Sequence, residues 1–316
     1  MDLHLLFHSV LMHVSAAMII LIYLPLSIPV KLFMWAFVKP FRKEDLRGKV
    51  VLITGASSGI GEELAYQYAE KGACLALVAR RKQALDLVAN AGVWSICRFD
   101  EVTDITAFTK LMDVNFWGSV YPTYYALPHL KASKGKLIVS SSIAGTVGPA
   151  RTSFYNATKA AQLKFYETLR SELGSEVGVT ILTPRFVESE ITKGKVIQKG
   201  GEVAVDEEAR DAQIGVFPVG HVETLCKVAL DAIRKGNWYV TWPSLYRPVP
   251  LVALLTPEVF DWQFKALYNA KEGTRPLSQR MLEATGAKRL FPPSLRHHPG
   301  IKTEKSDFSE YASSNV

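Results

Sequence analysis

The segment Lys49–Arg81, KVVLITGASSGIGEELAYQYAEKGACLALVARR, decides the fold of this 316-residue chain. An apolar run at 50–53 predicts one buried β-strand, and a second run at 75–78 predicts another. Between them lie apolar residues at helical spacing: Ile60, Leu64, Ala65 and Tyr68. A strand, a glycine-rich turn, a helix and a second strand in this order form the parallel crossover unit of α/β proteins. The sequence therefore predicts an α/β fold with a doubly wound parallel sheet.

The glycine-rich turn of this segment predicts a dinucleotide site. Gly55, Gly59 and Gly61 stand where the first strand ends and the helix begins. Without side chains, the backbone can approach a pyrophosphate that sits on the helix N-terminus. The predicted cofactor contacts from this turn are Thr54, Gly55, Ser57, Ser58, Gly59, Ile60 and Gly61.

The end of the second strand predicts which dinucleotide binds. An acidic side chain there would bind the ribose 2′-hydroxyl of NAD, whereas this chain has Arg80 and Arg81. Guanidinium groups suit a 2′-phosphate. One arginine could simply be solvated, but two adjacent arginines without a nearby carboxylate favour NADP(H).

A second segment, SSIAGTVGPARTSFYNATK at 141–159, carries the candidate chemistry. Tyr155 and Lys159 are four residues apart where a helix is predicted, so they emerge on one face. Ser142 precedes them and follows the apolar run 136–139. A phenol with a pKa near ~10 is a poor acid or base at pH 7, and an adjacent ammonium is expected to favour the phenolate. The segment predicts a general acid/base for hydride transfer at an alcohol or ketone.

These two segments together resemble the short-chain dehydrogenase/reductase family. TGASSGIG at 54–61 is similar to its cofactor motif, and Ser142, Tyr155 and Lys159 to its catalytic set. The match extends from Gly48 to about Thr192 and implies a Rossmann-like fold.

Further family motifs are present with two departures. Asn90, Ala91 and Gly92 are similar to the family's NNAG motif, except that Ala89 replaces the first asparagine. Asn115, in MDVNFWG, is similar to the fourth catalytic residue. At Pro184-Arg185 the family usually has Pro-Gly close to the nicotinamide, so the bulky arginine bears on how the cofactor fits.

The resemblance implies a role for each catalytic residue. Tyr155 would exchange a proton with the substrate oxygen, and Ser142 would hydrogen-bond that oxygen. Lys159 would hold the nicotinamide ribose, and Asn115 would order a water leading to Lys159. Tyr155 and Lys159 would therefore also contact the cofactor.

The largest departure from the family lies between Arg81 and Asn90, where only eight residues intervene. The fold normally continues there through a helix, a third strand with an adenine-binding aspartate, a further helix and a fourth strand. One crossover takes at least about 10 residues, and two would be needed. If 85–88 is the fourth strand, roughly four linking residues reach only ~14 Å. The third-strand unit is missing, and both alternative splicing and a faulty gene model would produce such a deletion.

Residues 1–39 predict an uncleaved membrane or lipid-droplet anchor. Between Leu3 and Val38 only Lys31 is reliably charged, and a bilayer core of roughly 30 Å takes about 20 helical residues. The start Met1-Asp2 and the continuing apolar character do not match a signal peptide. Because Pro25 and Pro29 interrupt the segment, a kinked spanning helix and a hairpin within one leaflet are both compatible with it.

The remaining chain is expected to contain four parts. A basic linker at 40–47 favours the cytosolic side for the domain that follows. A catalytic domain at 48–242, a C-terminal extension at 243–295 and a disordered polar tail at 296–316 come next. The predicted elements are helices at 104–111, 121–130, 222–235 and 257–270, strands at 179–182 and 238–240, and a mobile lid at 188–200. The helix at 257–270 could cap the core or lie on a membrane.

Composition limits the other classes of function. With 48% hydrophobic residues the chain can build one large core, and its net charge of +7 is scattered, which argues against nucleic acid as a partner. Cys74, Cys97 and Cys226 are expected as core residues in a reducing compartment. No spacing of metal ligands is present, so no metal site is predicted.

Within the family, the proline-interrupted apolar N-terminus, FYNATK and the long C-terminal extension most resemble the membrane-anchored hydroxysteroid dehydrogenases, especially the steroleosins of seed oil bodies. This resemblance implies an NADP(H)-dependent oxidoreductase that interconverts a hydroxyl and a ketone on a sterol-like substrate. It would act at the endoplasmic reticulum membrane or a lipid-droplet surface, and a homodimer is compatible with it. The alternative, favoured by the short Arg81–Asn90 connection, is a cofactor-deficient variant that acts as a lipid-droplet structural or interaction protein.

Overall fold

The computed structural model describes residues 3–39, 41, 43–78, 89–268 and 274–296. The chain divides into an N-terminal unit that ends at Asp45 and a main unit that begins at Leu46. This boundary falls inside the predicted basic linker at 40–47.

The N-terminal unit is helical. Its elements are α1 (Leu3–Met18), the π-helical turn η1 (Ile19–Tyr23), α2 (Leu24–Phe33) and a second π-helical turn η2 (Met34–Val38). Pro25 lies in the first turn of α2 and Pro29 lies inside it, yet the helix continues through both. The wider turn η1 directly precedes Pro25, where a missing N–H would leave a carbonyl without its usual partner. Of the two arrangements compatible with the sequence, the structure contains the continuous helix and not the hairpin.

This helix meets the requirements for a membrane span by length and composition. The stretch Leu6–Val38 contains 33 residues, and its side chains are not buried by the protein. At 1.5 Å per residue it is about 50 Å long, which exceeds a hydrocarbon core of roughly 30 Å.

The main unit is built on a parallel sheet. Its strands are β1 (Val50–Thr54), β2 (Cys74–Val78), β4 (Lys136–Ser140), β5 (Gly178–Pro184) and β8 (Tyr239–Trp242). β2 pairs with β1, and β4 pairs with β5, which pairs with β8. Among the described residues, Ala89 joins the two groups through parallel bridges to Thr54 and Val139. The order across the described part of the sheet is therefore β2, β1, Ala89, β4, β5, β8.

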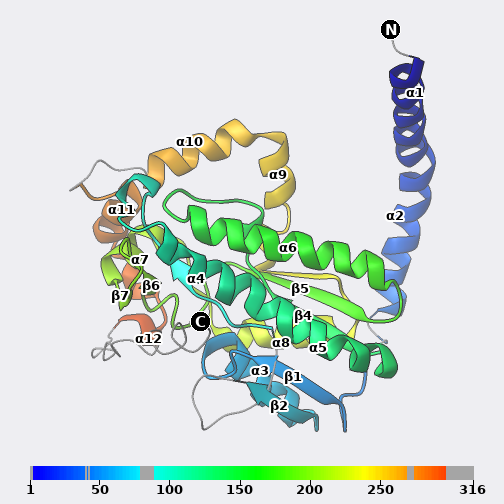
Figure 1. Cartoon of the computed structure of the whole chain (residues 1–316), viewed down its shortest axis with the longest axis horizontal. Helices are drawn as coiled ribbons and strands as arrows, with labels where there is room; N and C mark the ends of the chain where they lie inside the picture. Colours follow the sequence, from blue (N-terminus) through cyan, green and yellow to red (C-terminus); the bar gives the residue numbers. More distant parts are fainter. Residues whose placement is uncertain (1–2, 40, 42, 79–88, 269–273, 297–316) are drawn as a thin grey trace. The chain divides into compact units, whose positions relative to one another are not determined.

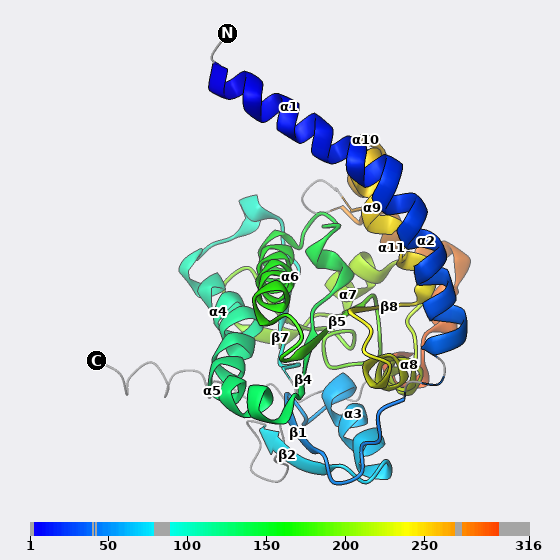
Figure 2. The ribbon, with the colours of Figure 1, turned by 90° about the vertical axis from the view of Figure 1, so that its right-hand side faces the viewer.

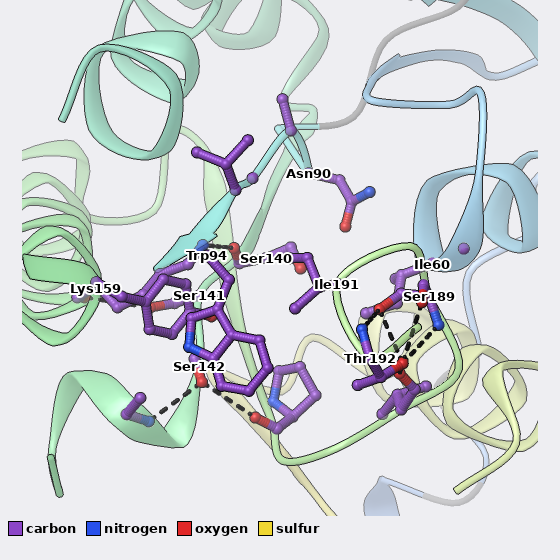
Figure 3. A pocket seen from close by; sticks show the side chains of 18 of the residues that line it. Ile60, Asn90, Trp94, Ser140, Ser141, Ser142, Lys159, Ser189, Ile191 and Thr192 are labelled. Atoms are coloured by element: carbon purple, nitrogen blue, oxygen red, sulfur yellow. Dashed lines mark hydrogen bonds between the residues drawn. The ribbon is translucent and has the colours of Figure 1, made fainter. Parts of the chain in front are cut away.

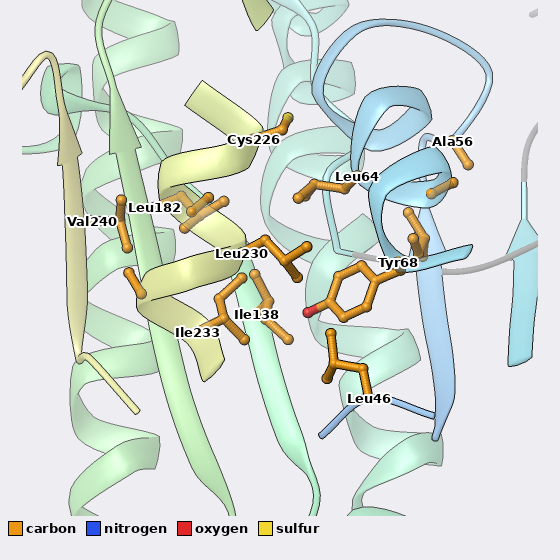
Figure 4. Packing of buried hydrophobic residues seen from close by; sticks show 14 residues of the cluster. Leu46, Ala56, Leu64, Tyr68, Ile138, Leu182, Cys226, Leu230, Ile233 and Val240 are labelled. Carbon is orange, nitrogen blue, oxygen red and sulfur yellow. The ribbon is translucent and has the colours of Figure 1, made fainter. Parts of the chain in front are cut away.

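Helices cover both faces of this sheet (Figures 1 and 2). They are α3 (Gly59–Glu70) and α8 (Val222–Arg234) on one face, and α5 (Gly118–Ser133) and α6 (Ser153–Leu173) on the other. Because alternate strand residues point to opposite faces, Ile138 packs with α3 and α8, whereas Leu137 and Val139 pack with α6. Figure 4 shows the first cluster, in which Leu64 and Tyr68 meet Leu230.

The missing third-strand unit leaves part of the sheet uncovered. Among the described residues β2 pairs only with β1, so it is an edge strand. Val50 is 76% exposed and Leu52 is 40% exposed, which corrects the expectation that 50–53 is fully buried. These side chains lie on the face of β1 away from α3, where a helix of the missing unit would pack. Cys74 on β2 is exposed for the same reason and is not the core residue expected, whereas Cys97 and Cys226 are buried.

Several predicted elements fall on residues 79–88, which lie outside the described part of the chain. Arg80, Arg81 and the proposed fourth strand at 85–88 are among them. Their structural roles stay predictions.

The helical region around Asn115 differs from its prediction. Instead of separate helices at 104–111 and 121–130, one helical run is formed by η4 (Thr106–Phe108), α4 (Thr109–Met112), the π-helical turn η5 (Asp113–Trp117) and α5. Asn115 lies in η5. π-helical turns within α-helices are frequent at functional sites.

A second, smaller sheet was not predicted. It consists of β3 (Trp94–Ser95), β6 (Lys195–Ile197) and β7 (Val203–Val205) in the order β3, β6, β7. β6 belongs to the region expected as a lid at 188–200, so part of that region is a strand whose Val196 and Ile197 are buried. The short helices η3 (Phe99–Glu101), η6 (Ile143–Gly145) and α7 (Glu207–Ile214) complete this side of the molecule.

The C-terminal extension is helical and packs on the rest of the main unit. It contains η7 (Ser244–Tyr246), α9 (Val249–Leu255), α10 (Pro257–Tyr268), α11 (Leu277–Thr285), η8 (Ala287–Leu290) and α12 (Pro293–Arg296). On α10, Tyr268 is buried while Val259 and Trp262 are exposed, so this helix caps the interior with one face. The predictions of α8, α10 and the strand at 238–240 are confirmed within a few residues. The tail expected at 296–316 lies outside the described residues, apart from Arg296 at the end of α12.

Candidate active site

A cavity of about 570 Å³ lies at the carboxyl ends of β1, β4 and β5. This is the position at which open parallel sheets bind their ligands. Among the predicted site residues that the structure describes, all line the cavity except Gly61 and Asn115, which contact residues that line it. The fold thus brings together the glycine-rich turn, the Asn-Ala-Gly motif and the catalytic set.

The glycine-rich turn has room only for glycine at two positions. A Cβ atom on Gly55 would lie 2.8 Å from the backbone nitrogen of Ala91, and one on Gly61 would lie 2.5 Å from the carbonyl oxygen of Gly55. Ser58, at the N-cap of α3, makes no side-chain hydrogen bond to the first turn of the helix. The N–H groups of that turn remain available to a negatively charged ligand. This part of the cavity fits a pyrophosphate.

The Asn-Ala-Gly motif is tied to the same turn. The backbone N–H of Asn90 donates to Oγ1 of Thr54 at 2.9 Å, and Nδ2 of Asn90 donates to the carbonyl oxygen of Gly55 at 3.4 Å. Thr54 therefore fixes two motifs that are 36 residues apart in sequence.

Ser142 is positioned by the end of β4. It is the N-cap of η6, and its Oγ accepts a hydrogen bond from the backbone N–H of Ala144 at 3.1 Å (Figure 3). The same oxygen donates to the carbonyl oxygen of Pro184 at 3.4 Å. Both contacts hold the hydroxyl at the cavity wall next to Trp94.

The environment of Tyr155 differs from the expectation. Burial raises the pKa of its phenol to about 12, and a hydrogen bond with Ser142 offsets only part of this effect. The ammonium of Lys159 lies 5.9 Å from the centre of the Tyr155 ring, over its face. Desolvation has the largest effect on the phenol in this structure, and the expected role of Lys159 in favouring the phenolate stays a prediction.

Lys159 is a buried cation held by neutral oxygens. Its Nζ donates to the carbonyl oxygen of Ser140 at 3.1 Å and to Oε1 of Gln162 at 3.2 Å. Burial lowers the pKa of Lys159 to about 8. Gln162 is fully buried, and its Nε2 has no hydrogen-bond partner among the described residues. Sequence reasoning missed Gln162, although its position three residues after Lys159 on α6 places it on the same helical face.

Asn115 acts in the structure as a connector between segments. Its Nδ2 donates to the carbonyl oxygen of Val93 at 3.0 Å and to Oγ1 of Thr158 at 2.9 Å. Its Oδ1 accepts the backbone N–H of Val93 at 2.8 Å. Both amide hydrogens are therefore used, and only a lone pair of Oδ1 remains for a water.

The cavity is completed by residues that carried no sequence signal. Trp94 lies 6.2 Å from the Tyr155 ring and 6.3 Å from that of Phe186, measured between ring centres. α10 contributes Phe264 and Tyr268. These side chains come from segments far apart in the chain, so no local spacing could reveal that they meet.

The segment after Val187 packs against the glycine-rich turn. Oγ1 of Thr192 accepts the backbone N–H of Ser189 at 2.9 Å and donates to the carbonyl oxygen of Val187 at 2.6 Å (Figure 3). A Cβ atom on Gly59 would lie 3.2 Å from Cβ of Ser189. This contact closes one side of the region that fits a pyrophosphate.

Arg185, at the position where a glycine was expected, directs its guanidinium onto aromatic rings. The guanidinium carbon lies 4.0 Å from the centre of the Phe217 ring, 4.6 Å from Tyr246 and 5.1 Å from Phe186. Arg185 also belongs to the cavity lining. The extra bulk is therefore accommodated beside the C-terminal extension.

Comparison with protein-family models identifies a short chain dehydrogenase match at residues 49–89 and 83–200. The match comes in two pieces that meet where the third-strand unit is missing. The chain is 41% identical to 11-beta-hydroxysteroid dehydrogenase A of Arachis hypogaea over 86% of this chain and 91% of that protein. It is 40% identical to 11-beta-hydroxysteroid dehydrogenase 1A of Arabidopsis thaliana over 83% of this chain and 88% of that protein.

The extent of the first alignment agrees with a deletion. It spans 318 positions but includes 86% of the 316 residues of this chain, about 272, so about 46 positions have no counterpart here. That number is enough for two crossovers of ordinary size.

Solved structures share the fold. A short chain dehydrogenase from Burkholderia cenocepacia in complex with NADP has a TM-score of 0.58 at 21% identity and covers 70% of this chain and 99% of that one. A short chain dehydrogenase/reductase from Burkholderia phymatum in complex with NAD also has a TM-score of 0.58, at 20% identity, and covers 68% of this chain and 96% of that one.

Proposed function

Since this chain belongs to the short-chain dehydrogenase/reductase family, we propose that it is an NADP(H)-dependent oxidoreductase that interconverts a hydroxyl and a ketone on a steroid-like substrate. The observation that carries this proposal is the cavity in which Ser142, Tyr155 and Lys159 face the same space as the glycine-rich turn. The names of the relatives in Arachis hypogaea and Arabidopsis thaliana support a steroid as the substrate class.

The residues of the cavity can perform the proton chemistry of this reaction. The Tyr155 hydroxyl, with its pKa raised to about 12, is protonated at neutral pH and is suited to donate a proton to a ketone oxygen during reduction. Ser142 would hold that oxygen by a hydrogen bond. The nicotinamide, when bound, would supply or accept a hydride at the substrate carbon that carries this oxygen.

Lys159 and Asn115 support Tyr155 in this proposal. Lys159 has a third N–H beyond the two that are bound to Ser140 and Gln162, and this N–H can bind the nicotinamide ribose. The positive charge of Lys159 would stabilise the phenolate that develops when Tyr155 donates its proton, and in the reverse reaction it would favour the phenolate that accepts a proton. Asn115 maintains the position of Val93 at the cavity wall, and its free Oδ1 lone pair can order a water.

The preference for NADP(H) rests on Arg80 and Arg81. Each arginine can form a charge-assisted hydrogen bond with a 2′-phosphate, worth roughly 1.5–3 kcal/mol. Replacing both by alanine is expected to weaken NADPH binding far more than NADH binding. Equal losses for the two cofactors would remove the arginines from this role.

The long apolar helix of the N-terminal unit supports attachment to a membrane. We place the protein at the endoplasmic reticulum or a lipid droplet, and the basic residues of the linker at 40–47 favour the cytosolic side for the main unit. A sterol-like substrate would partition into the same lipid phase.

The direct test is turnover of NADPH with an 11-ketosteroid by the purified full-length protein in lipid nanodiscs. Tyr155→Phe is expected to abolish turnover, because it removes the proton donor and leaves the ring. Tyr166→Phe is the matched control, because it removes the hydroxyl of a fully buried tyrosine that bonds to Thr123 outside the cavity. Turnover that survives Tyr155→Phe would exclude the proposed mechanism.

A second candidate function follows from the missing third-strand unit. The exposed Val50 and Leu52 mark an apolar surface that a catalytic domain of full length would cover. We propose as the alternative that the chain no longer holds cofactor and acts as a lipid-droplet structural or interaction protein. A fluorescence titration with NADPH distinguishes the two, because only the oxidoreductase has to bind the cofactor.

A further inference from the structure

Arg185 has an environment that the proposed reaction does not explain. Its guanidinium packs against Phe217, Tyr246 and Phe186, as described above. Partial burial lowers the pKa of Arg185, although the phenols of Tyr246 and Tyr268 act in the opposite direction. Aromatic faces and phenols compensate a partly buried positive charge only in part.

No carboxylate of the described residues forms an ion pair with Arg185, and its buried Nε has no hydrogen-bond partner there. Arg210 illustrates the usual arrangement in the same protein. It is fully buried and pairs with both Glu207 and Asp211. Arg185 is only partly buried, but among the described residues its buried Nε and its guanidinium lack such partners, and a ligand with a negative charge would supply them.

The position of Arg185 shows where that ligand would lie. Arg185 and Tyr268 line the cavity together with Tyr155. A row of rings leads from Tyr155 to Trp94 and on to Phe186, with centres 6.2 Å and 6.3 Å apart. The guanidinium of Arg185 lies 5.1 Å from the centre of the Phe186 ring. Apolar rings thus connect the proton donor with the cation along the lining of one cavity.

We propose that Arg185 and Tyr268 form an anion-binding end of the substrate cavity, which selects an amphipathic substrate with an oxyanion, a sulfate or a carboxylate, opposite the reacting carbon. The planar guanidinium matches the oxygens of such a group in a bidentate arrangement. The apolar body of the substrate would pack on Trp94 and Phe186. The identity of the reacting end rests on the proposed function, whereas the anion site itself does not.

The cofactor is a second source of negative charge, but its pyrophosphate is expected in another part of the cavity. The region that fits a pyrophosphate is formed by the glycine-rich turn and Ser189. Arg185 contacts the C-terminal extension through Tyr246 and Tyr268 instead.

The test compares the binding of a steroid 3-sulfate with that of the same steroid carrying a free 3-hydroxyl. Binding to the full chain without cofactor is followed by the change in tryptophan fluorescence, because Trp94 lines the cavity. We expect the sulfate to bind at least about tenfold more tightly, the size of one hydrogen bond to a charged group. Equal binding of the two steroids by the wild type would overturn the proposal.

Variants assign the preference to Arg185. Arg185→Gln is expected to lose the tenfold preference, and Arg185→Lys to keep part of it. The matched control is Arg170→Gln, because Arg170 also packs on two aromatic rings, Trp238 at 4.8 Å and Tyr239 at 5.1 Å, but lies outside the cavity. A preference that survives Arg185→Gln, or is lost equally in Arg170→Gln, would overturn the assignment. If Arg185→Gln does not fold, Arg185→Lys and Tyr268→Phe are compared instead. A full preference for the sulfate in Arg185→Lys, together with loss of the preference in Tyr268→Phe, would contradict a role for the Arg185 guanidinium.

A parallel titration with NADPH separates this inference from the proposed function. A loss of NADPH affinity in Arg185→Gln, with the steroid preference unchanged, would assign the guanidinium to the cofactor and overturn the anion site. Selective binding of the steroid sulfate without NADPH turnover would instead support the anion site and contradict the proposed oxidoreductase activity.

Discussion

The side-chain oxygen of Gln162 lies 3.2 Å from the ammonium nitrogen of Lys159, and both residues are buried on α6. An amide oxygen stabilises a buried ammonium without supplying a negative charge. Lys159 is therefore charged or neutral depending on the pH near 8, and Gln162 is one of the two oxygens that favour the charged form.

Replacing Gln162 by leucine is expected to lower the pKa of Lys159 further below about 8, because one acceptor of the ammonium is lost. In the pH profile of kcat/KM, the apparent pKa that reports the titration of Lys159 should therefore shift to a lower pH. The rate of reductive methylation of Lys159, measured by mass spectrometry against pH, gives the same information without turnover. Gln67→Leu is the control, because Gln67 is a buried glutamine that bonds to Glu63 and Glu223 away from the cavity. An unchanged profile in Gln162→Leu would show that Gln162 does not tune Lys159.

Lys159→Met is expected to change how stability depends on pH. The pKa of Lys159 is about 8 in the folded protein and near ~10.4 in the unfolded chain, so the unfolded chain binds more protons between these values. Stability of the wild type should therefore rise from pH 8 to pH 10, by about 2 kcal/mol. The variant should lack this rise in thermal unfolding, whereas Lys164→Met on the exposed side of α6 should retain it. The same slope in wild type and Lys159→Met would contradict the lowered pKa.

Gly61→Ala is expected to damage the dinucleotide turn. Its Cβ would lie 2.5 Å from the Gly55 carbonyl oxygen and 2.8 Å from Nδ2 of Asn90, so backbone has to move. Overpacking of this kind costs about 1–3 kcal/mol of stability, and we expect weaker NADPH binding as well. Gly200→Ala is the control, because its Cβ would meet only the mobile end of the Glu202 side chain. Equal NADPH affinity in Gly61→Ala and wild type would remove the turn from the cofactor site.

Insertion of a third-strand unit of ordinary family length between Arg81 and Asn90 is expected to raise both NADPH turnover and the melting temperature. The adenosine half of a dinucleotide normally rests on this unit, and binding energy from that half positions the nicotinamide. The insert would also cover Val50 and Leu52. A Gly/Ser insert of equal length serves as the control. If the original chain already turns over at a rate that the insert does not improve, the short connection is tolerated.

Residues 1–39 fused to a soluble reporter are expected to carry it to membranes or lipid droplets. Because the helix continues through both prolines, Pro25→Leu with Pro29→Leu should leave this localisation unchanged. Leu21→Arg with Leu26→Arg should abolish it, since each arginine near the helix centre costs about 2.5–3.5 kcal/mol on insertion. A reporter that remains soluble in cell fractionation would exclude the anchor.

Local patterns in the sequence were sufficient for the main parallel sheet, most of its covering helices and the motif residues that lie at the candidate site. The motifs that contain Gly55, Gly61, Tyr155 and Lys159 are recognisable in the sequence, because the function of these residues depends on backbone geometry and spacing within a few residues. The missing third-strand unit was also evident, since the reach of a chain segment follows from its length alone.

Tertiary structure alone decided what surrounds those residues. The raised pKa of Tyr155 and the lowered pKa of Lys159 come from burial, which is a sum over segments distant in sequence. The surroundings of Arg185 likewise bring the end of β5 together with Phe217, Tyr246 and Tyr268, and none of these residues has a characteristic sequence spacing from Arg185. Motifs specify which groups are present, but only the folded chain sets their distances and their access to water, and these determine charge and specificity.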